Sequence, residues 1–345
     1  MTTSTPSPSP QAPAAPTGAA RRQVVVDTDT GLDDALALLY LAGSPHADIA
    51  AVTTVYGNCV VEDSARNAAH VLRLAGLADV PLSLGAAGPL EGEAHIAGYV
   101  HGGDGLGDLG LDRPDPEVTQ RTSAEQLVHL ANSAPGRYDL LALGPLTNVA
   151  LALRLDPLLL TKLRSVVVMG GSGPYRPLGE VLMVDANVQN DPAAARELLA
   201  APRPAADTLT LVGVDVTATV VLDEAMVESL RRAGTAWGDF AAATLDAYAD
   251  FYAHEWGRRV SPVHDGLAAG VLARPELVTA TVSGPGAVMS NGSATRARVL
   301  RLPDGTPPAV RPDHPPMPVL TAVTAVDRAA FLADFVTSLA EGVRR

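Results

Sequence analysis

Lysine is almost absent from this chain, and cysteine and aromatic residues are scarce. Lys162 is the only lysine, Cys59 is the only cysteine, and aromatic side chains make up 4% of the 345 residues. A single cysteine excludes an intramolecular disulfide and a zinc site built on several cysteines. No apolar run approaches the roughly 18 residues that a membrane-spanning helix needs, so we expect no membrane contact.

Basic residues are also fewer than acidic ones. The chain has 25 Lys and Arg against 38 Asp and Glu, a formal net charge of −13 at pH 7. Nucleic-acid binding needs clustered basic side chains, so we expect no nucleic acid among the partners. Hydrophobic residues form 47% of the chain, so it can bury a large core, built mainly from Val, Leu and Ala. The lone cysteine fits a reducing compartment, and we expect a cytoplasmic protein.

The first 22 residues differ in composition from the rest. Residues 1–20 hold five Pro, five Ala, four Thr and three Ser, and no charged side chain. Such a segment buries too little apolar surface to offset the entropy lost on ordering, so residues 1–22 are predicted to be a disordered tail. The segment also lacks the charged start and apolar block of a secretory signal. Because no linker divides the remainder, residues 23–345 are predicted to form a single domain.

From residue 23 onward, short apolar runs alternate with segments of helical length. Strands are predicted at Val24–Val26, Ile49–Val55, Val80–Leu84, Leu140–Leu143, Val166–Met169, Leu209–Val214, 278–283, 296–301 and 318–323. Helices are predicted at Asp33–Ala42, Glu62–Ala75 and Ser123–Ser133, twice within 223–256, and near 327–341. This alternation indicates an α/β fold with an open, mostly parallel β-sheet, flanked by helices on both faces as in Rossmann-like cores.

Four carboxylates directly follow the first predicted strand. Asp27, Asp29, Asp33 and Asp34 lie within eight residues, between this strand and the first helix. A helix N-terminus stabilises one or two Asp residues, but four neighbouring like charges are unfavourable unless a cation neutralises them. Because all the side-chain donors are oxygens, the cluster favours Ca²⁺ or Mg²⁺ over zinc. Sites of open α/β sheets form beyond the carboxyl ends of strands, where this cluster falls.

The segment Asp27-Thr28-Asp29 also fits a second class of enzyme. Phosphatases of the haloacid dehalogenase kind open with Asp-x-Asp at a strand end, where the first Asp is the nucleophile. A metal-dependent phosphatase would therefore use both Asp27 and Asp29. It would also need a downstream basic residue for the phosphate, and Lys162 has no motif around it. A capped helix with a solvated acidic loop is the remaining interpretation.

The whole cluster, Asp27-x-Asp29-x-Gly31-x-Asp33-Asp34, resembles the N-terminal fingerprint of the nucleoside hydrolases, the inosine–uridine-preferring ribohydrolase family. Further segments resemble the same family in the same order: Thr53-Thr54-Val55-Tyr56-Gly57-Asn58, Arg66-Asn67-Ala68, His101-Gly102-Gly103-Asp104-Gly105-Leu106-Gly107, Leu143-Gly144-Pro145-Leu146-Thr147-Asn148, Met169-Gly170-Gly171, Asn187 with Asp191-Pro192, and Val263-His264-Asp265. The resemblance implies that the chain is an enzyme that splits ribonucleosides into base and ribose.

The resemblance also implies a Ca²⁺ site. Its ligands would be Asp29, Asp34, Asp265 and the main-chain carbonyl of Leu143, with two ribose hydroxyls and a water completing the shell. Asp29 would also be the catalytic base that takes a proton from this water. The implied chemistry is physically sound, because a cation lowers the pKa of its water and a nearby carboxylate can complete the deprotonation.

Contacts with the ribose are implied in the same way. Asp33, Asn58 and Asn187 would bind the ribose hydroxyls, and Met169 would pack under the ribose. Cleavage of an N-glycosidic bond passes through an oxocarbenium-like sugar, as in O-glycoside hydrolysis. Anionic Asp residues nearby would stabilise the positive charge that develops on this sugar.

Contacts with the nucleobase would come from other segments. His264 would lie near the base and, as the second catalytic residue, assist its departure, since a leaving base needs a proton donor. His101 lies in a glycine-rich segment that could close over the substrate, and the alternative is an ordinary solvated histidine. Tyr252 is predicted to share a helix face with Tyr248, and family members carry base-recognition residues at this position. Trp256 is assigned to the core.

Two departures from the family pattern concern the 5′ end of the ribose. The family usually has Glu-x-Asn before the Asp-Pro and contacts the 5′-hydroxyl through this Glu, whereas this chain has Asp185-Ala186-Asn187. Asp185 is one methylene shorter, so its substrate contact would be lost or run through water. Many members place an Asn for the same hydroxyl where this chain reads Leu178-Gly179-Glu180. We therefore hypothesise that 5′-modified or 5′-deoxy ribosides are accepted.

Two alternatives to the hydrolase remain open on the sequence alone. One is the phosphatase that uses Asp27 and Asp29, and the other is a non-catalytic, metal-dependent nucleoside or sugar binder. The preference for purine or pyrimidine bases depends on residues 85–121 and 245–264 and does not follow from the motifs. Family members are dimers or tetramers, so the resemblance implies a homodimer or homotetramer.

Overall fold

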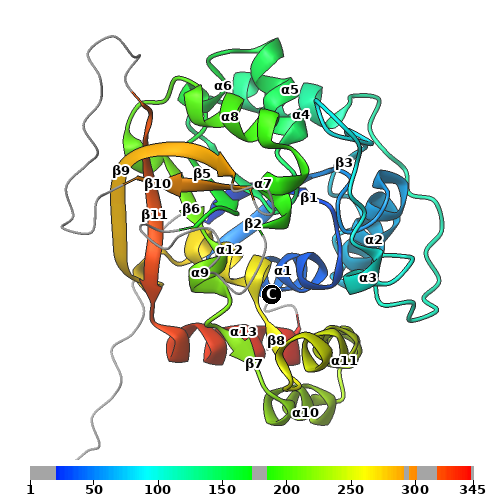
Figure 1. Ribbon diagram of the computed structural model, residues 1–345. Coiled ribbons are helices and arrows are strands. Elements are labelled where there is room, and N and C mark those ends of the chain that lie inside the picture. The colour runs from blue at the N-terminus through cyan, green and yellow to red at the C-terminus, as the bar shows by residue number, and fades with distance from the viewer. Residues whose placement is uncertain (1–20, 173–184, 291–294, 301–316, 343–345) are drawn as a thin grey trace, which may run out of the picture.

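The structure, a computed structural model, describes residues 21–172, 185–290, 295–300 and 317–342 (Figure 1). Within these residues, nine strands form one sheet in the order β10-β9-β11-β6-β5-β4-β1-β2-β3. They are β1 (Arg22–Thr28), β2 (Ala47–Thr54), β3 (Leu82–Ser83), β4 (Tyr138–Ala142), β5 (Ser165–Met169), β6 (Leu209–Val212), β9 (Val278–Ser290), β10 (Thr295–Val299) and β11 (Val319–Val326). Each predicted strand has its counterpart, and β1 begins one residue before the predicted start of the domain. Residues 1–20 of the predicted tail and the segment Leu178-Gly179-Glu180 lie outside the described residues.

The sheet is mostly parallel, which confirms the predicted fold class. Seven strands from β11 to β3 run parallel to one another, and within this sheet β9 runs antiparallel to the strands on either side. β1 pairs with β2 on one side and with β4 on the other. The strand order therefore reverses at β1: β2 and β3 are added on one side of it, and β4, β5 and β6 on the other. In open α/β sheets a crevice opens at such a reversal, outside the carboxyl ends of the strands.

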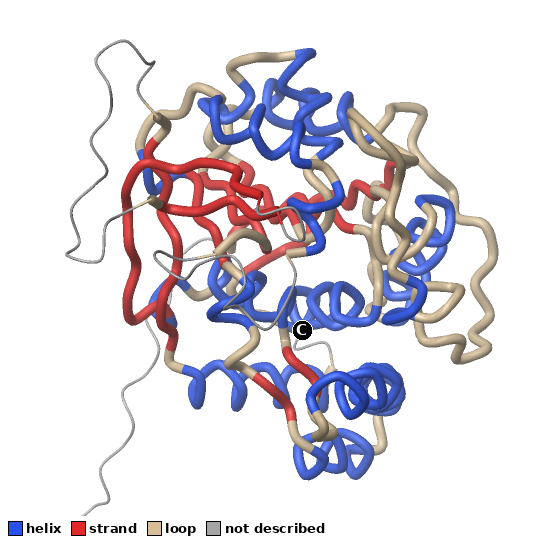
Figure 2. The backbone as a smooth tube through the Cα atoms, in the orientation of Figure 1, coloured by secondary structure: helices blue, strands red, loops and turns tan. Residues whose placement is uncertain are grey.

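Helices cover both faces of the sheet (Figures 1 and 2). Along β1, Val24 and Val26 pack in one hydrophobic cluster and Val25 in the other, as the two-residue period of a strand requires. The first cluster includes α1 (Leu32–Gly43), α2 (Val61–Leu74), α12 (His264–Ala273) and α13 (Arg328–Glu341). The second includes α4 (Ser123–Ser133), α5 (Thr147–Leu155), α6 (Leu159–Lys162) and α8 (Pro192–Ala200).

Two further helices and a small sheet extend beyond the first helical layer. β7 (Val221–Leu222) pairs with β8 (Ser261–Pro262), and α10 (Glu224–Ala233) and α11 (Ala236–Trp256) connect them (Figure 1). Gly257 ends α11 with a φ of +66°, a conformation that glycine adopts without steric cost. Tyr248 and Tyr252 share one face of α11, as predicted, and pack against Leu32 at the start of α1. α11 therefore brings two phenol rings to the loop that follows β1.

The remaining described elements are short. They are α3 (Gly98–His101), α7 (Ala186–Asn190), α9 (Val214–Thr217), and 3-10 turns at Ala206–Thr208 and Pro275–Leu277. The predicted strand Leu209–Val214 ends at Val212, because Gly213 leads directly into α9. Among the described helices, none has both the length and the apolar character that a membrane crossing requires.

Candidate active site

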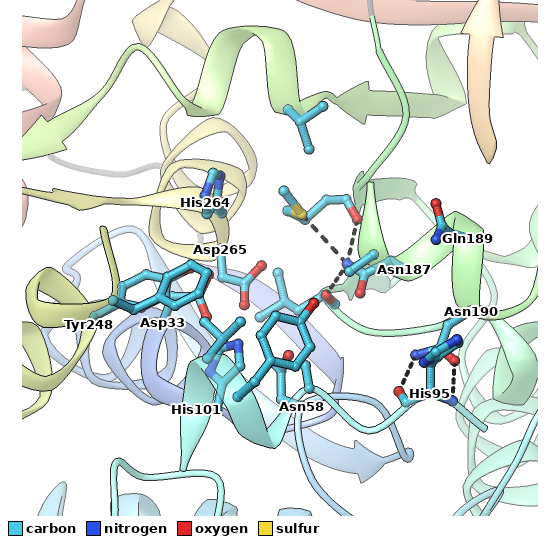
Figure 3. Close-up of a pocket in the computed structure, with 18 of the residues that line it drawn as sticks. Asp33, Asn58, His95, His101, Asn187, Gln189, Asn190, Tyr248, His264 and Asp265 are labelled. Carbon is cyan, nitrogen blue, oxygen red and sulfur yellow. Dashed lines mark hydrogen bonds between the residues drawn. The ribbon is translucent and has the colours of Figure 1, made fainter. Parts of the chain in front are cut away.

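A cavity of about 420 Å³ lies at the carboxyl ends of the parallel strands (Figure 3). Its walls come from the segments that follow β1, β2 and β4, from the end of β5, and from α3, α7, α9, α11 and α12. The residues of the predicted site that line it are Asp33, Asn58, His101, Leu143, Met169, Asn187, Tyr252, His264 and Asp265. Folding thus gathers most of the predicted site around one cavity, although these residues are far apart in the sequence.

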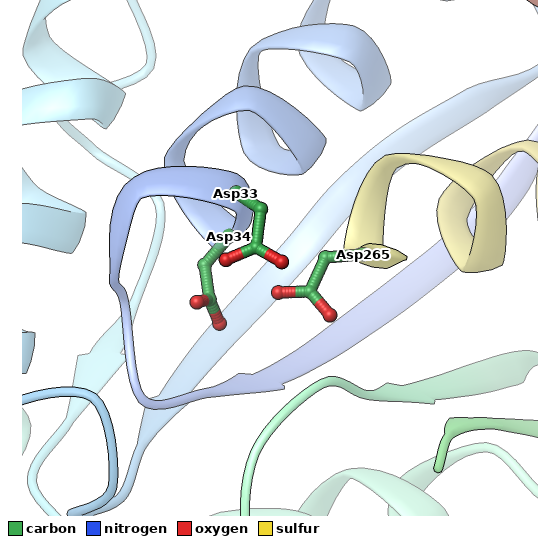
Figure 4. A group of neighbouring side chains, drawn as sticks. All are labelled: Asp33, Asp34 and Asp265. Carbon is green, nitrogen blue, oxygen red and sulfur yellow. The ribbon is translucent and has the colours of Figure 1, made fainter. Parts of the chain in front are cut away.

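Three carboxylates in this region are close enough together to hold a metal ion (Figure 4). Asp33, Asp34 and Asp265 are buried, and each offers an oxygen that lies within 4.8 Å of the others. The first two occupy the first turn of α1, and Asp265 occupies the first turn of α12. Two helix N-termini meet here, and the partial positive charge of each favours carboxylates. The prediction grouped Asp34 and Asp265 with Asp29, whereas the group in the structure contains Asp33 and not Asp29.

Asp29 is buried beside this group and does not line the cavity. Its Oδ2 accepts a hydrogen bond of 2.8 Å from the main-chain N–H of Asn58. Its Oδ1 is buried and has no hydrogen-bond partner among the described residues. Leaving a buried carboxylate oxygen unpaired is costly, so this atom is available to a cation or a water.

Asp34 is held by three hydrogen bonds. Its Oδ1 accepts from Thr28 Oγ1 at 2.6 Å, and its Oδ2 accepts from the Gly31 N–H at 2.9 Å and from Asn58 Nδ2 at 2.8 Å. Asn58 thus contacts Asp29 through its backbone and Asp34 through its side chain, and it fixes the two carboxylates relative to one another. Position 31 must be glycine, because a Cβ there would lie 2.5 Å from His101 Nδ1 and 2.6 Å from Asn58 Nδ2.

Burial and mutual repulsion make this acidic group hard to ionise by itself. Burial first, and then the charge of Asp34, raise the pKa of Asp29 well above its usual value and that of Asp33 to about 8. Burial first, and then the charge of Asp33, raise the pKa of Asp265 as well. A divalent cation offsets both costs, because it supplies opposite charge and ligates the oxygens. The oxygen-only donor set and the unpaired Asp29 Oδ1 therefore fit a hard divalent cation.

Asn187 and Met169 form the adjoining wall of the cavity. Asn187 Nδ2 lies 2.5 Å from the carbonyl oxygen of Leu143 and 3.0 Å from that of Met169, and it donates to both. The Met169 sulfur lies 3.5 Å from the same amide nitrogen. The wall thus combines an amide, which can bind hydroxyl groups, with an adaptable apolar surface.

His101 is buried, which excludes an ordinary solvated histidine. Its Nδ1 accepts a hydrogen bond of 3.1 Å from the main-chain N–H of Leu32, and burial lowers its pKa to about 3. A neutral imidazole whose Nδ1 accepts a hydrogen bond carries its proton on Nε2. His101 therefore offers an N–H donor to a ligand in the cavity that it lines.

His264 lies between two hydroxyl groups. Its Nδ1 is 2.6 Å from Thr217 Oγ1 and its Nε2 is 3.2 Å from Tyr252 Oη. Tyr252 donates to Tyr248 Oη over 3.4 Å, and Tyr248 donates to Asp33 Oδ2 over 3.4 Å. Burial lowers the pKa of His264 to about 4, so its imidazole is neutral at pH 7. A chain of polar groups therefore links His264 to Asp33.

Aromatic rings build another part of the cavity wall. Trp256, which was assigned to the core, lines the cavity with its ring centroid 4.5 Å from that of Tyr252. The assignment holds in part, because Trp256, at the end of α11, is half-buried and packs against the hydrophobic cluster of Leu32, Tyr248 and Tyr252. Phe251 and Tyr99 also line the cavity, with ring centroids 6.2 Å apart. Sequence reasoning missed both, since nothing around Tyr99 signals that α3 meets α11.

Asp185, a predicted substrate-binding residue whose contact was expected to be lost or to run through water, does not line the cavity. Its Oδ1 accepts from the Val188 N–H at 3.2 Å and caps α7, and its Oδ2 accepts from the Gly171 N–H. Both carboxylate oxygens are thus engaged inside the protein, because the short side chain folds back onto the helix that follows it. Asp185 supports Asn187, which lies on that helix.

The structure removes the grounds for a phosphatase. Asp27 is buried away from the cavity, where its Oδ1 accepts from Thr53 Oγ1 at 2.6 Å and from Asn148 Nδ2 at 2.8 Å. Lys162, the candidate phosphate ligand, forms an ion pair with Asp156 instead and does not line the cavity either. Among the described residues, Asp27 and Lys162 are therefore not brought together at this site.

An open, mostly parallel sheet with a group of buried carboxylates at its carboxyl edge, beside an aromatic-walled cavity, is the arrangement of an α/β enzyme that can hold a metal ion. Comparison with known proteins identifies the family. A family model described as inosine-uridine preferring nucleoside hydrolase matches residues 24–333. The chain belongs to this metal-dependent family, whose members act on N-glycosyl bonds.

Individual relatives agree with the family model. The chain is 34% identical over 265 residues to the probable uridine nucleosidase 2 of Oryza sativa subsp. japonica, a match that covers 74% of this chain and 75% of the relative. It is 34% identical over 260 residues to the pyrimidine-specific ribonucleoside hydrolase RihA of Photobacterium profundum, covering 74% and 81%. The solved structure of a plant nucleoside hydrolase, the PpNRh1 enzyme, matches with a TM-score of 0.84 and 28% identity, covering 93% and 100%.

Proposed function

We propose that this chain hydrolyses the N-glycosidic bond of ribonucleosides and releases the free base and ribose. The observation that carries the proposal is that one cavity joins an oxygen-only cation site to a buried histidine between two hydroxyl groups. The carboxylate group and its cation can bind a sugar diol. The histidine lies among aromatic rings, against which a nucleobase can stack. The anionic side chains at the sugar end stabilise an oxocarbenium-like transition state.

The proposed metal ion is Ca²⁺, held by Asp29, Asp34, Asp265 and the carbonyl of Leu143. Calcium accepts six to eight oxygen ligands in flexible geometry, which suits crowded carboxylates on two helix N-termini. When bound, the cation lowers the pKa of a water and orients the sugar diol. The choice of calcium is supported by the oxygen-only donor set and by the resemblance to the family.

The ribose is proposed to bind at Asp33, Asn58 and Asn187, with Met169 beneath the ring. All four side chains line the cavity. The carboxylate accepts hydrogen bonds from sugar hydroxyls, and the two amides can both donate and accept. The Asn187 amide donates to two main-chain carbonyls. A ribose hydroxyl that accepts a hydrogen bond from this amide would replace one of these bonds.

Asp29 is proposed to take the proton of the attacking water. The Asn58 N–H fixes Oδ2, so the carboxylate is oriented with Oδ1 left for the proton. As the water oxygen bonds to the anomeric carbon, the C–N bond breaks and its electron pair leaves with the base. The water proton stays on Asp29 Oδ1, and a second proton is needed at the departing base.

His264 and Tyr252 are proposed to supply that second proton. The imidazole is neutral at pH 7, so it stores no extra proton: its Nε2–H passes to Tyr252 Oη as that hydroxyl protonates the base. Solvent then replaces the proton lost from the relay and takes up the one held on Asp29, so the cycle closes. Tyr252 Oη lies 3.2 Å from His264 Nε2 and borders the cavity. His101 adds a fixed N–H donor that can bind an acceptor on the base.

Replacing His264 with Gln is expected to lower kcat on nucleosides by about 10²–10⁴-fold, the usual contribution of acid–base catalysis. Gln keeps a polar group between Thr217 and Tyr252 but cannot pass a proton from one side to the other. On 4-nitrophenyl riboside, whose leaving group needs no proton, the loss should largely disappear. The control His129→Gln changes an exposed histidine on α4. Equal losses on both substrates would contradict the relay.

We propose that the 5′-hydroxyl contributes little to substrate binding. Asp185 stands where the family contacts this hydroxyl, and both of its carboxylate oxygens are bonded to main-chain N–H groups. Removing the hydroxyl should therefore change kcat/KM by less than about tenfold, far below the 10⁴–10⁵-fold penalty of a site built to bind it. The comparison is inosine against 5′-deoxyinosine. Asp185→Glu restores the family residue and should increase discrimination, and a large loss in the unmodified chain would refute the proposal.

The experiment that tests the function is a substrate panel. Purified protein is incubated with uridine, cytidine, inosine, adenosine and guanosine, and ribose release is followed with calcium and with a chelator. We expect calcium-dependent release, with uridine the first candidate because two similar proteins are named for uridine or pyrimidine hydrolysis. No release from any nucleoside by folded protein would move the assignment to 5′-modified ribosides or to a non-catalytic binder.

We also propose that residues 23–345 form a single domain that assembles as a homodimer or homotetramer and works in the cytoplasm. The single domain is supported by one sheet that runs from β1 to β11. The assembly and the location rest on analogy with the family. Light scattering after size exclusion tests the assembly, and fractionation of producing cells tests the location.

A further inference from the structure

One arginine ties the glycine-rich segment that carries His101 to the rest of the site. The side chain of Arg113, in the loop after this segment, is 13% exposed. Its Nη1 donates to the carbonyl of Asp104 at 3.1 Å and to Asn67 Oδ1, and its Nη2 forms an ion pair of 3.0 Å with Asp104 Oδ2. A single guanidinium group therefore holds α2 and the glycine-rich segment together.

Asn67 connects the same segment to the carboxylate loop. It is fully buried in α2, and its Nδ2 donates to the carbonyls of Thr30 and Asp104, both at 2.9 Å. Thr30 directly follows Asp29. The amide of Asn67 thus spans the two loops that carry the candidate base and His101, and its oxygen accepts from Arg113.

Asp104 also organises the turn that follows His101. Its Oδ1 accepts from the Leu106 N–H at 2.7 Å and from the Asp108 N–H at 3.0 Å. The Gly107 N–H then donates to the carbonyl of His101 at 2.7 Å. The backbone at His101 is therefore linked through two steps to the carboxylate that Arg113 holds.

We propose that Arg113 is a positioning residue for the nucleoside site: through Asp104 and Asn67 it holds His101 with Nδ1 against the Leu32 N–H and Nε2–H available to the substrate. The inference rests on the proposed function, because the donor matters only when a nucleoside fills the cavity. Leu106 also anchors the segment in the core, but an apolar contact has no direction. The planar guanidinium fork fixes direction as well as distance.

Kinetics of Arg113→Met test whether the arginine acts through His101. Methionine keeps the aliphatic stem and removes the guanidinium, and we expect kcat/KM to fall by about tenfold or more. In a His101→Ala background the same change should cost nothing further, because the group that it positions is gone. The control Arg66→Met removes an arginine of α2 that pairs with Asp63 and Asp115 at the surface, and it should stay within about twofold.

The ring nitrogens of His101 give a readout that does not depend on turnover. Nuclear magnetic resonance of ¹⁵N-labelled histidine separates protonated from unprotonated ring nitrogens, and His101→Ala identifies the signals. We expect a single tautomer with the proton on Nε2 in the wild type and in Arg66→Met, and a mixture of tautomers in Arg113→Met. If Arg113→Met does not fold, Arg113→Lys takes its place. Lysine can keep the ion pair with the Asp104 carboxylate, but it cannot also reach the Asp104 carbonyl and Asn67 Oδ1.

Two results would overturn the proposal. One is an unchanged His101 tautomer in the Arg113 variant, and the other is a kinetic loss that multiplies with that of His101→Ala, as a purely structural role would give. The proposed function is tested separately. If the wild type and Arg66→Met hydrolyse no ribonucleoside, the chain is not a nucleoside hydrolase. The tautomer comparison still decides in that case whether Arg113 positions His101.

Discussion

The Asp29→Asn variant is expected to release ribose about 10³-fold more slowly than the wild type at saturating substrate. Asn has nearly the same shape and keeps an oxygen for the Asn58 N–H, but it cannot take up a proton. Because the change removes proton transfer rather than substrate contacts, kcat should fall while KM changes little. The measurement is the initial rate of ribose release at saturating calcium, with the unfolding midpoint as the check on folding.

Asp27→Asn is the matched control for this variant. It makes the same chemical change two residues upstream, at a buried Asp that does not line the cavity and whose Oδ1 is bonded to Thr53 and Asn148. We expect a rate within about tenfold of the wild type, as for a change that perturbs packing alone. A phosphatase would reverse the order of the two variants, and a non-catalytic binder would show no turnover in any of them. Unimpaired turnover in Asp29→Asn would remove Asp29 from the role of base.

Withdrawing calcium is expected to have an effect of similar size. A chelator should lower ribose release by about 10³-fold, because water activation and orientation of the diol are lost together. Calcium at about 100 times its Kd should stabilise the folded chain by about 2.7 kcal/mol, which raises the unfolding midpoint by roughly 5 °C. The gain has a clear physical origin, since the cation neutralises carboxylates whose pKa values burial and repulsion raise.

Asp265→Asn should abolish this response. The variant removes one of the three carboxylates that can share an ion, so both the midpoint shift and the activity at moderate calcium should be lost. Asp223→Asn is the control, because Asp223 caps α10 and Asn caps helices equally well. An equal midpoint shift in Asp265→Asn and the wild type would show that calcium binds elsewhere.

The strands and long helices could be predicted because their signals are local. The runs Val24–Val26 and Leu140–Leu143 are continuously apolar, which is typical of strands covered on both faces, and both lie in the parallel sheet. The short helices α7 and α9 gave no such signal, since four or five residues are too few to show a helical period. β9 runs on to Ser290, well past its predicted end, because pairing with β10 and β11 sustains it.

Some residues of the candidate site could likewise be predicted from a local sequence pattern, and others could not. The cluster Asp27 to Asp34 is visible in the sequence, because four like charges in one loop call for a cation. Asp265 and Leu143 were assigned only through resemblance to the family. Their positions beside the cluster follow from the strand order, which sets β4 next to β1, and from the packing of α12 against α1.

The sequence by itself determined the alternation of strands and helices, the acidic loop after the first strand and the chemistry of its donors, because these depend on residue type and on neighbours along the chain. The tertiary structure alone decided that Asp33 joins the carboxylate group, that Asp185 caps a helix, that Trp256 borders the cavity, and that Arg113 reaches Asn67 and Asp104. Each of these depends on contacts between residues that are far apart in the sequence, and no local sequence pattern specifies such contacts.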